Sequence, residues 1–160
     1  MNRILDFDQE QGLITVEAGA TWPELMRGYL SRQARNAVQW GIRQKQTGAD
    51  RLTIGGALAA NVHGRGLKMK PFIDDVESFV LVDAKGGSRT CSRAQNAELF
   101  RLAIGGYGLF GVVSTVRLRL SPRQKIQRVV EVREIDHRYH FGTHRAAARR
   151  EAVEYLFIGR

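Results

Sequence analysis

T-I-G-G-A-L-A-A-N-V-H-G-R-G, residues 53–66, is the stretch that says most about this chain. Its fourteen residues include four glycines and three alanines. Glycine at this density costs conformational entropy in an ordinary helix or strand, so we expect something to approach the backbone closely here. The segment therefore indicates one of two arrangements: a helix packed tightly on a sheet, or a ligand bound against the main chain.

Apolar residues recur every four positions in this segment, at Ile54, Leu58 and Val62. The spacing predicts a short helix whose N-terminus lies at 53–56. Backbone N–H groups at a helix N-terminus bind phosphate when no Cβ keeps it at a distance, and we expect those of Gly55 and Gly56 to be exposed. The segment matches neither G-x-G-x-x-G nor G-x-x-x-x-G-K-[ST], so it carries neither a Rossmann nor a P-loop fingerprint.

The length and composition are those of one ordinary domain. The chain has 160 residues, of which 43% are apolar, and this is enough for a hydrophobic core. It holds no run of about 18 apolar residues and no secretory signal, so we expect a cytoplasmic protein without membrane contact. Its one cysteine, Cys91, fits a reducing compartment and lies in a strand-like stretch, where we expect neither a metal ligand nor a nucleophile.

The net charge of +9 is concentrated near the C-terminus. Residues 117–150 hold ten Lys or Arg against three acidic residues, a net charge of +7. Arg117 and Arg119 alternate with apolar residues, which is typical of the solvated face of a sheet. Attraction of an anionic cofactor or acidic substrate is the second interpretation. Nucleic-acid binding is the third and the least favoured, because no aromatic residues interleave the basic ones as they do in single-strand binders.

The first half of the chain predicts two strands and a helix. Residues 3–7 and 13–18 are strand-like and are separated by a polar turn, as in a hairpin. Thr21 and Glu24 form a capping-box pattern that predicts a helix running to about residue 32. Its predicted apolar face consists of Leu25, Met26, Tyr29 and Leu30.

The second half is richer in strands. Residues 76–84 and 89–92 flank K-G-G-S and predict a hairpin, and residues 96–102 predict a short helix. We expect the core side of that helix to hold Leu99, Phe100 and Leu102. A glycine-punctuated bend from residue 104 then leads into a strand ending near residue 120, and residues 125–135 predict another strand. A helix over 145–158 is left open, because that segment lacks a clear apolar stripe.

Four blocks of the sequence, taken together, resemble the PCMH-type FAD-binding domain of the vanillyl-alcohol oxidase and p-cresol methylhydroxylase superfamily, also known as FAD-linked oxidases. The blocks follow the family's order and approximate spacing over residues 3–136. They are L-I-T-V-E-A-G-A-T-W-P-E-L at 13–25, the 53–66 segment, A-E-L-F at 97–100, and the glycine-rich stretch at 105–120. Four ordered blocks are far more specific than one glycine-rich loop.

The resemblance implies an α+β domain that binds FAD, consisting mostly of the family's second subdomain, with a mixed or antiparallel sheet flanked by helices. Residues 1–136 would form this partial domain, and residues 137–160 would be a divergent basic tail. The residues that the resemblance assigns to FAD binding form three groups: the flavin and pyrophosphate wall at Gly48, Thr53, Ile54, Gly55 and Gly56; its continuation at Ala60, Asn61, Val62, His63 and Gly64; and the adenine contact at Val112 or Val113. His63 could orient the flavin or bear on the substrate, or it could be a structural histidine.

The sequence also departs from the family pattern. The glycine-rich R-G-G-G-H-S-like loop of the first subdomain and the C-terminal substrate domain have no counterpart here, so both are expected as missing partners. The parent reaction implied is flavin-dependent oxidation of a hydroxyl carbon in a sugar, lactone or hydroxy acid. The alternative is a non-catalytic stand-alone module. No catalytic residue is assigned, since Asp74, Asp75 and Glu77 read as a solvated turn. We expect no metal site at His137, His140 and His144.

Overall fold

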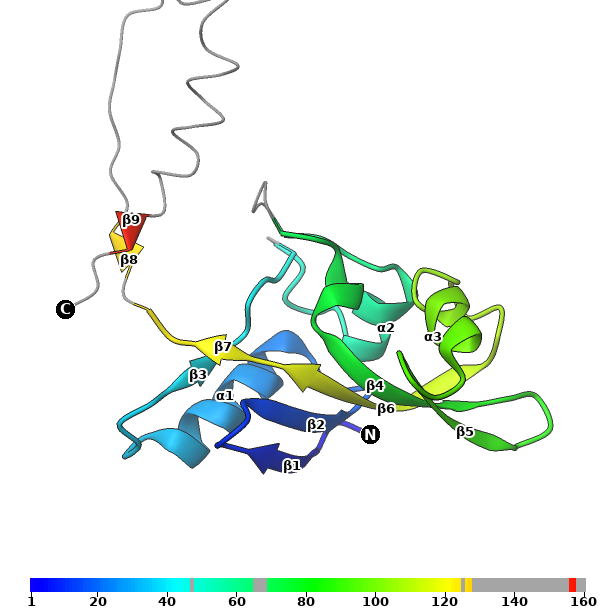
Figure 1. The fold of residues 1–160 in the computed structure, drawn as a ribbon, viewed down its shortest axis with the longest axis horizontal. Coiled ribbons are helices and arrows are strands. Elements are labelled where there is room, and N and C mark those ends of the chain that lie inside the picture. Colours follow the sequence, from blue (N-terminus) through cyan, green and yellow to red (C-terminus); the bar gives the residue numbers. More distant parts are fainter. Residues whose placement is uncertain (47, 65–68, 125, 128–155, 158–160) are drawn as a thin grey trace, which may run out of the picture. The chain divides into compact units, whose positions relative to one another are not determined.

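The computed structural model describes residues 1–46, 48–64, 69–124, 126–127 and 156–157 (Figure 1). Contacts divide the chain into two compact units, Met1–Pro122 and Arg123–Arg160. In the second unit, β8 (Ile126–Gln127) pairs antiparallel with β9 (Leu156–Phe157). The predicted strand at 125–135 is described only at β8. The helix left open at 145–158 lies outside the described residues except at 156–157, which form a strand.

The first unit is built on a five-stranded sheet in the order β1-β2-β6-β4-β5, in which all neighbours are antiparallel. Its strands are β1 (Ile4–Asp8), β2 (Leu13–Glu17), β4 (Val76–Val82), β5 (Ser88–Ser92) and β6 (Val112–Arg119). Both predicted hairpins, β1–β2 and β4–β5, are confirmed. A separate two-stranded ladder joins β3 (Trp40–Gly41) to β7 (Ser121–Pro122). The sheet with its helices confirms the α+β class.

Strand β6 lies at the centre of the sheet and shows why one face is buried. Successive side chains of a strand point to opposite faces. Val116 and Leu118 are 0% and 2% exposed, and they stand opposite Val16 and Ile14 of β2. The intervening Arg117 is only partly buried and Arg119 is exposed. The predicted alternation of charged and apolar residues is therefore present along this strand.

Helix α1 (Trp22–Gln33) begins at the predicted capping box. The Glu24 carboxylate accepts hydrogen bonds from the N–H and the hydroxyl of Thr21, both at 2.8 Å. The prediction that Leu30 belongs to the buried face is wrong, since Leu30 is 38% exposed. The buried side chains follow the three- and four-residue spacing of one helix face; they are Trp22, Leu25, Tyr29 and Gln33.

Helix α3 (Ala97–Ala103) buries Phe100 rather than Leu102. The Phe100 ring stacks on Phe79 of β4 with centroids 5.5 Å apart. Leu102 is 47% exposed, so its expected place in the core is wrong, while Ala103 is buried and Leu99 packs against the core. A short helix exposes part of any apolar run, because residues two positions apart point in nearly opposite directions.

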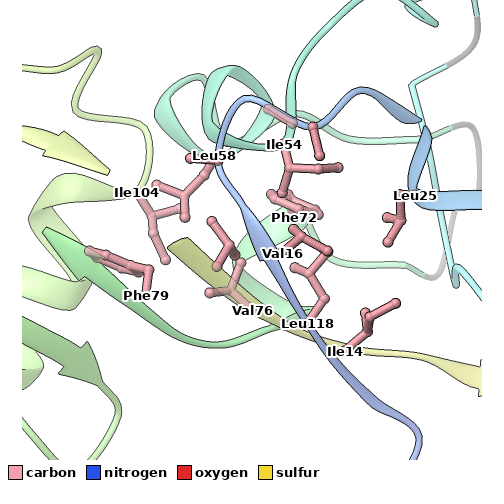
Figure 2. Close-up of a cluster of buried hydrophobic side chains, with 14 of the residues drawn as sticks. Ile14, Val16, Leu25, Ile54, Leu58, Phe72, Val76, Phe79, Ile104 and Leu118 are labelled. Atoms are coloured by element: carbon pink, nitrogen blue, oxygen red, sulfur yellow. The ribbon is translucent and has the colours of Figure 1, made fainter. Parts of the chain in front are cut away.

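The remaining helices of the first unit cover the buried face of the sheet. They are α2 (Ile54–Ala59) and the single 3-10 turn η1 (Phe72–Asp74). Figure 2 shows their side chains meeting those of β2, β4 and β6. Ile54 and Leu58 are both 0% exposed, so the predicted apolar spacing of the small-residue segment is confirmed for this part. The core therefore holds α2 against the end of β2.

Candidate cofactor groove

The N-terminus of α2 is fixed by the three residues that follow β2. Ile54 N–H donates to Ala20 O at 2.7 Å, and Gly55 N–H donates to Ala18 O at 2.8 Å. Gly56 N–H donates to the hydroxyl of the capping residue Thr53 at 3.0 Å. These bonds use the donors that a helix N-terminus ordinarily leaves free. The expectation that the N–H groups of Gly55 and Gly56 are exposed for a phosphate is therefore wrong.

Close packing explains why residue 55 is a glycine, but it does not require a glycine at position 56. A Cβ on Gly55 would lie 2.9 Å from Ala18 Cβ and 3.1 Å from Ala18 O, closer than side chains normally pack. A Cβ on Gly56 would lie 3.1 Å from Leu52 Cδ1, the end of a flexible side chain, and 3.2 Å from Thr53 Oγ1. Gly55 is thus required for the contact between α2 and the β2 terminus. Gly56 is more tolerant of a methyl group.

Beside this contact the first unit forms a groove of about 420 Å³. Three of the four sequence blocks contribute to it, although they lie far apart in the chain. Its lining residues are Met1, Ala18, Gly19, Thr53, Gly55, Gly56, Ala59, Leu81, Ala103, Gly108, Phe110, Gly111, Val112 and Val113. Its volume falls within the range of small-molecule and cofactor sites.

The groove is apolar, and most of the side chains that line it are small. None of its lining residues carries a charged side chain, and Thr53 supplies the one hydroxyl among them. At the rim, Gly111 has a φ of +137°, and a Cβ there would lie 2.4 Å from Val82 O. Only glycine fits that position without a backbone shift. The lining favours a flat apolar group over a charged one.

Some main-chain N–H groups on the residues of the groove have no acceptor in the described part of the protein. Across the described ranges, the N–H groups of Gly19, Gly108 and Phe110 donate no hydrogen bond to the protein. Gly108 has a φ of +83°, and a Cβ there would meet nothing within 4 Å. Gly108 and Phe110 are exposed and Gly19 is half-buried, so their N–H groups can donate to the ring nitrogens or carbonyls of a bound heterocycle in place of water.

The structure brings together only some of the residues that the resemblance assigned to FAD binding. Thr53, Gly55, Gly56, Val112 and Val113 line the groove. The groove also has lining residues that were not named from sequence; they are Met1, Ala18, Gly19, Ala59, Leu81, Ala103, Gly108, Phe110 and Gly111. The two blocks at 13–25 and 105–120 contained a usable signal, since glycines at 19, 108 and 111 interrupt otherwise apolar stretches. Leu81 and Ala103 read as ordinary core residues and carried no such signal.

The other named residues lie elsewhere in the first unit. Ile54 is buried in the core at 0% exposed. Asn61 has a φ of +43° and accepts a hydrogen bond from Ile73 N–H at 3.0 Å, which fixes the turn after α2. His63 is exposed, and its Nδ1 lies 3.0 Å from Gly64 O. None of these three lines the groove.

Four further positions complete that set. Ala60 is the C-cap of α2, and Val62 packs against the edge of the core. Gly64 N–H donates to Gln44 Oε1 at 3.2 Å. Gly48 has a φ of +79°, and a Cβ there would meet nothing within 4 Å. These residues therefore form the chain leaving α2 and its neighbouring loop, and not the groove itself.

An ion pair and a thiol of the first unit have structural roles. Arg3 pairs with Glu17 through Nη2 and Oε1 at 2.8 Å, and Arg3 N–H donates to Glu17 Oε2 at 2.9 Å. These hydrogen bonds lower the pKa of Glu17 to about 2. The pair ties β1 to the end of β2, two residues before Gly19. Cys91 is buried, and burial raises the pKa of its thiol, which agrees with its expected lack of reactivity.

The tail histidines His137, His140 and His144 lie outside the described residues. Within the described ranges, no three His, Cys, Asp or Glu side chains gather as metal ligands would. Over the same ranges, no helix has the length and apolar character needed to cross a membrane.

Comparison with known proteins identifies the family. A family model described as an FAD binding domain matches residues 1–92, and the chain belongs to this family. The resemblance found in the four sequence blocks is confirmed, and FAD is the cofactor of the family. The chain is 37% identical over 101 residues to cytokinin dehydrogenase 9 of Oryza sativa subsp. japonica, which covers 62% of this chain and 19% of that protein.

Two further relatives act on sugar lactones by name. L-gulonolactone oxidase of Mus musculus is 32% identical over 124 residues, covering 77% of this chain and 26% of that protein. Mitochondrial L-galactono-1,4-lactone dehydrogenase of Arabidopsis thaliana is 31% identical over 126 residues, covering 79% and 20%. The chain thus spans about a fifth to a quarter of the length of these relatives.

A solved structure has the same fold. Alkyldihydroxyacetonephosphate synthase superposes with a TM-score of 0.62 at 22% identity, covering 78% of this chain and 22% of that one. The α+β architecture inferred from the resemblance is therefore confirmed. At this identity the likeness bears on the fold alone.

Proposed function

We propose that the groove binds an aromatic ring of FAD, as part of the cofactor site of a flavin-dependent oxidoreductase. The observation that carries the proposal is the apolar groove of about 420 Å³ built by three separated sequence blocks. Glycines and alanines on its walls allow a flat ring to lie against the main chain. The free N–H groups of Gly19, Gly108 and Phe110 supply donors for the ring's heteroatoms.

The groove fits a ring better than it fits the pyrophosphate. A pyrophosphate needs cationic side chains or free N–H groups at a helix N-terminus, and the groove has no charged side chain while the first N–H groups of α2 are already bonded. The pyrophosphate is then held by groups outside the groove. We propose that a separate N-terminal subdomain binds the pyrophosphate. A C-terminal domain is proposed to bind the substrate.

The proposed parent activity is oxidation of a hydroxyl carbon in a sugar, lactone or hydroxy acid. Bound FAD would accept the hydride, so the protein's part is to bind and orient the ring and to exclude water. The names of the two lactone-oxidising relatives support this substrate class. Because no titratable side chain lines the groove among the residues that the structure describes, we expect the acid or base of such a reaction to come from outside the groove.

The non-catalytic module remains the alternative function, and it is favoured by the same lack of a titratable side chain in the groove. A cytoplasmic location is likewise proposed, supported by the free thiol of Cys91.

Nucleic-acid binding stays the least favoured proposal. This proposal predicts that the affinity for DNA or RNA falls steeply as the salt concentration rises. If the protein does not retard DNA or RNA in a gel at low salt, the proposal is refuted.

A charge placed in the groove tests the proposal. Val112 lines the groove and is 70% exposed, so Val112→Glu adds a carboxylate without disturbing the core. Val38→Glu is a matched control, because Val38 is 58% exposed and does not line the groove. We expect Val112→Glu to weaken FAD binding about tenfold or more, which corresponds to about 1.4 kcal/mol, while Val38→Glu leaves it unchanged.

The measurement is a titration of FAD, riboflavin and ADP against each variant, followed by flavin fluorescence or calorimetry. Binding of riboflavin alone would assign the flavin ring to the groove, and binding of ADP alone would assign the adenine. Equal FAD affinities for the Val112 and Val38 variants would refute the assignment of the groove. The proposal also expects weak binding by this chain on its own, since the groove holds only one part of the cofactor.

A further inference from the structure

A second and much smaller cavity, of about 10 Å³, shares no lining residue with the cofactor groove. It is lined by side chains from α1, η1 and β6 and from the segments that follow β3 and β6. The residues that matter here are Trp22, Arg43, Phe72 and Asp75. Nothing in the proposed function uses this cavity.

Trp22 lines this cavity, and its indole has a donor without a partner among the described residues. Trp22 is 1% exposed, and its ring packs edge-on against Phe72 with centroids 5.6 Å apart. Its Nε1 has no hydrogen-bond partner in the described part of the chain. An indole N–H can only donate, so it requires an acceptor. Leaving such a buried group unpaired costs free energy.

The carboxylate of Asp75 presents the complementary acceptor. Asp75 was expected on a solvated turn, and that expectation is wrong, since its side chain is 6% exposed. Its Oδ1 lies 3.2 Å from Arg43 Nη1 as an ion pair, yet among the described residues that oxygen has no hydrogen bond of good geometry. Burial raises the pKa of this carboxyl, while Arg43 and Gln44 lower it.

The main chain of Asp75 explains why the carboxylate stays in this position. Asp75 N–H donates to Phe72 O at 2.9 Å, and Asp75 O accepts from Arg119 N–H at 2.8 Å. The residue is the C-cap of η1 and leads directly into β4. The backbone of Asp75 is therefore anchored on both sides, at the join between η1 and the sheet.

We infer that one buried water molecule occupies this cavity and bridges Trp22 Nε1 to Asp75 Oδ1. A water molecule can accept a hydrogen bond from the indole N–H and at the same time donate one to the carboxylate. The cavity of about 10 Å³ is about the size that a single water requires. Polar sites of this kind in protein interiors are normally hydrated.

Charged occupants are disfavoured by the groups that face the cavity. Arg43 repels a cation, and Asp75 repels an anion. The space of about 10 Å³ suits a single water molecule better than a larger ligand. The water therefore links the first residue of α1 to the turn before β4, and it completes the hydrogen bonding of two elements that share no direct polar contact at these atoms.

The two tryptophans of the chain allow a direct test on the wild-type protein. Trp40 serves as an internal control, because its Nε1 donates directly to Gln9 O at 2.7 Å. In a ¹⁵N-labelled sample, water-selective NOE and ROE spectra should show a long-lived water at the Trp22 indole proton, with the opposite signs that distinguish a bound water from proton exchange. The Trp40 indole proton should lack that signature.

A crystal structure gives the second measurement. We expect one water within hydrogen-bonding distance of both Trp22 Nε1 and Asp75 Oδ1, and its loss in Trp22→Phe, which keeps the aromatic contact with Phe72 but removes the donor. Absence of the long-lived water signal at Trp22, or a crystal structure with the indole bonded directly to the carboxylate, would overturn the inference. If Trp22→Phe fails to fold, the wild-type spectra alone still decide the question.

Discussion

Replacing Gly55 by alanine sets two effects of opposite sign against each other. Alanine favours helix over glycine by up to about 1 kcal/mol. The added Cβ, however, would lie 2.9 Å from Ala18 Cβ and 3.1 Å from Ala18 O, where the normal separation between carbons is about 3.5–4.0 Å. Overpacking of this kind costs about 1–3 kcal/mol. We therefore expect Gly55→Ala to lower the free energy of unfolding by about 1–2 kcal/mol.

Gly56→Ala is the matched control, since it lies in the same helix and gains the same propensity. Its Cβ would meet the movable end of Leu52 at 3.1 Å and the Thr53 hydroxyl at 3.2 Å, and its nearest neighbours include no backbone atom. We expect this variant to be as stable as wild type or up to about 1 kcal/mol more stable. The pair of variants thus isolates the contact between α2 and the end of β2.

Urea unfolding monitored by tryptophan fluorescence and circular dichroism would measure both variants. Adding Ala18→Gly to Gly55→Ala removes the 2.9 Å contact but leaves the one with Ala18 O. We expect a coupling of about 0.5 kcal/mol or more between the two substitutions. The reasoning fails if Gly55→Ala proves as stable as Gly56→Ala, because helix propensity would then outweigh the contact with Ala18.

Two further substitutions, and a third that serves as a control, test the ionic and aromatic contacts of the first unit. Because Arg3 lowers the pKa of Glu17 to about 2, the ionised carboxylate stabilises the folded state above its ordinary pKa of about 4.5 and loses this effect as pH falls toward 2. The stability difference between wild type and Glu17→Gln, measured by urea unfolding, should therefore shrink over that range; a constant difference would contradict the ion pair. Phe79→Ala should cost about 3–5 kcal/mol, since Phe79 is 1% exposed and stacks on Phe100. Leu102→Ala, at an exposed position, should change stability by less than about 0.5 kcal/mol, and a similar loss in both variants would argue against the burial of Phe79.

Local pattern predicted most of the elements, because capping, spacing and alternation act between residues close in the chain. The Thr21–Glu24 box placed the start of α1, and the alternation around Val116 identified β6. The same patterns failed for Leu30 and Leu102, which belong to apolar runs but turn toward solvent. Which side of a helix is buried depends on its tilt against a sheet assembled from distant segments, and no local pattern records that tilt.

The glycine-rich segment at 53–66 shows the same contrast between what local sequence determines and what tertiary packing determines. Sequence alone determined the family and its cofactor, since the four blocks keep their order and spacing whatever the details of packing, and it placed a helix N-terminus at Thr53. Tertiary structure decided what that N-terminus does. The carbonyls of Ala18 and Ala20 accept hydrogen bonds from the N–H groups of Gly55 and Ile54, and the groove is formed instead by this contact together with residues 108–113 at the start of β6. A donor's availability depends on every acceptor within about 3 Å, including those brought there by folding.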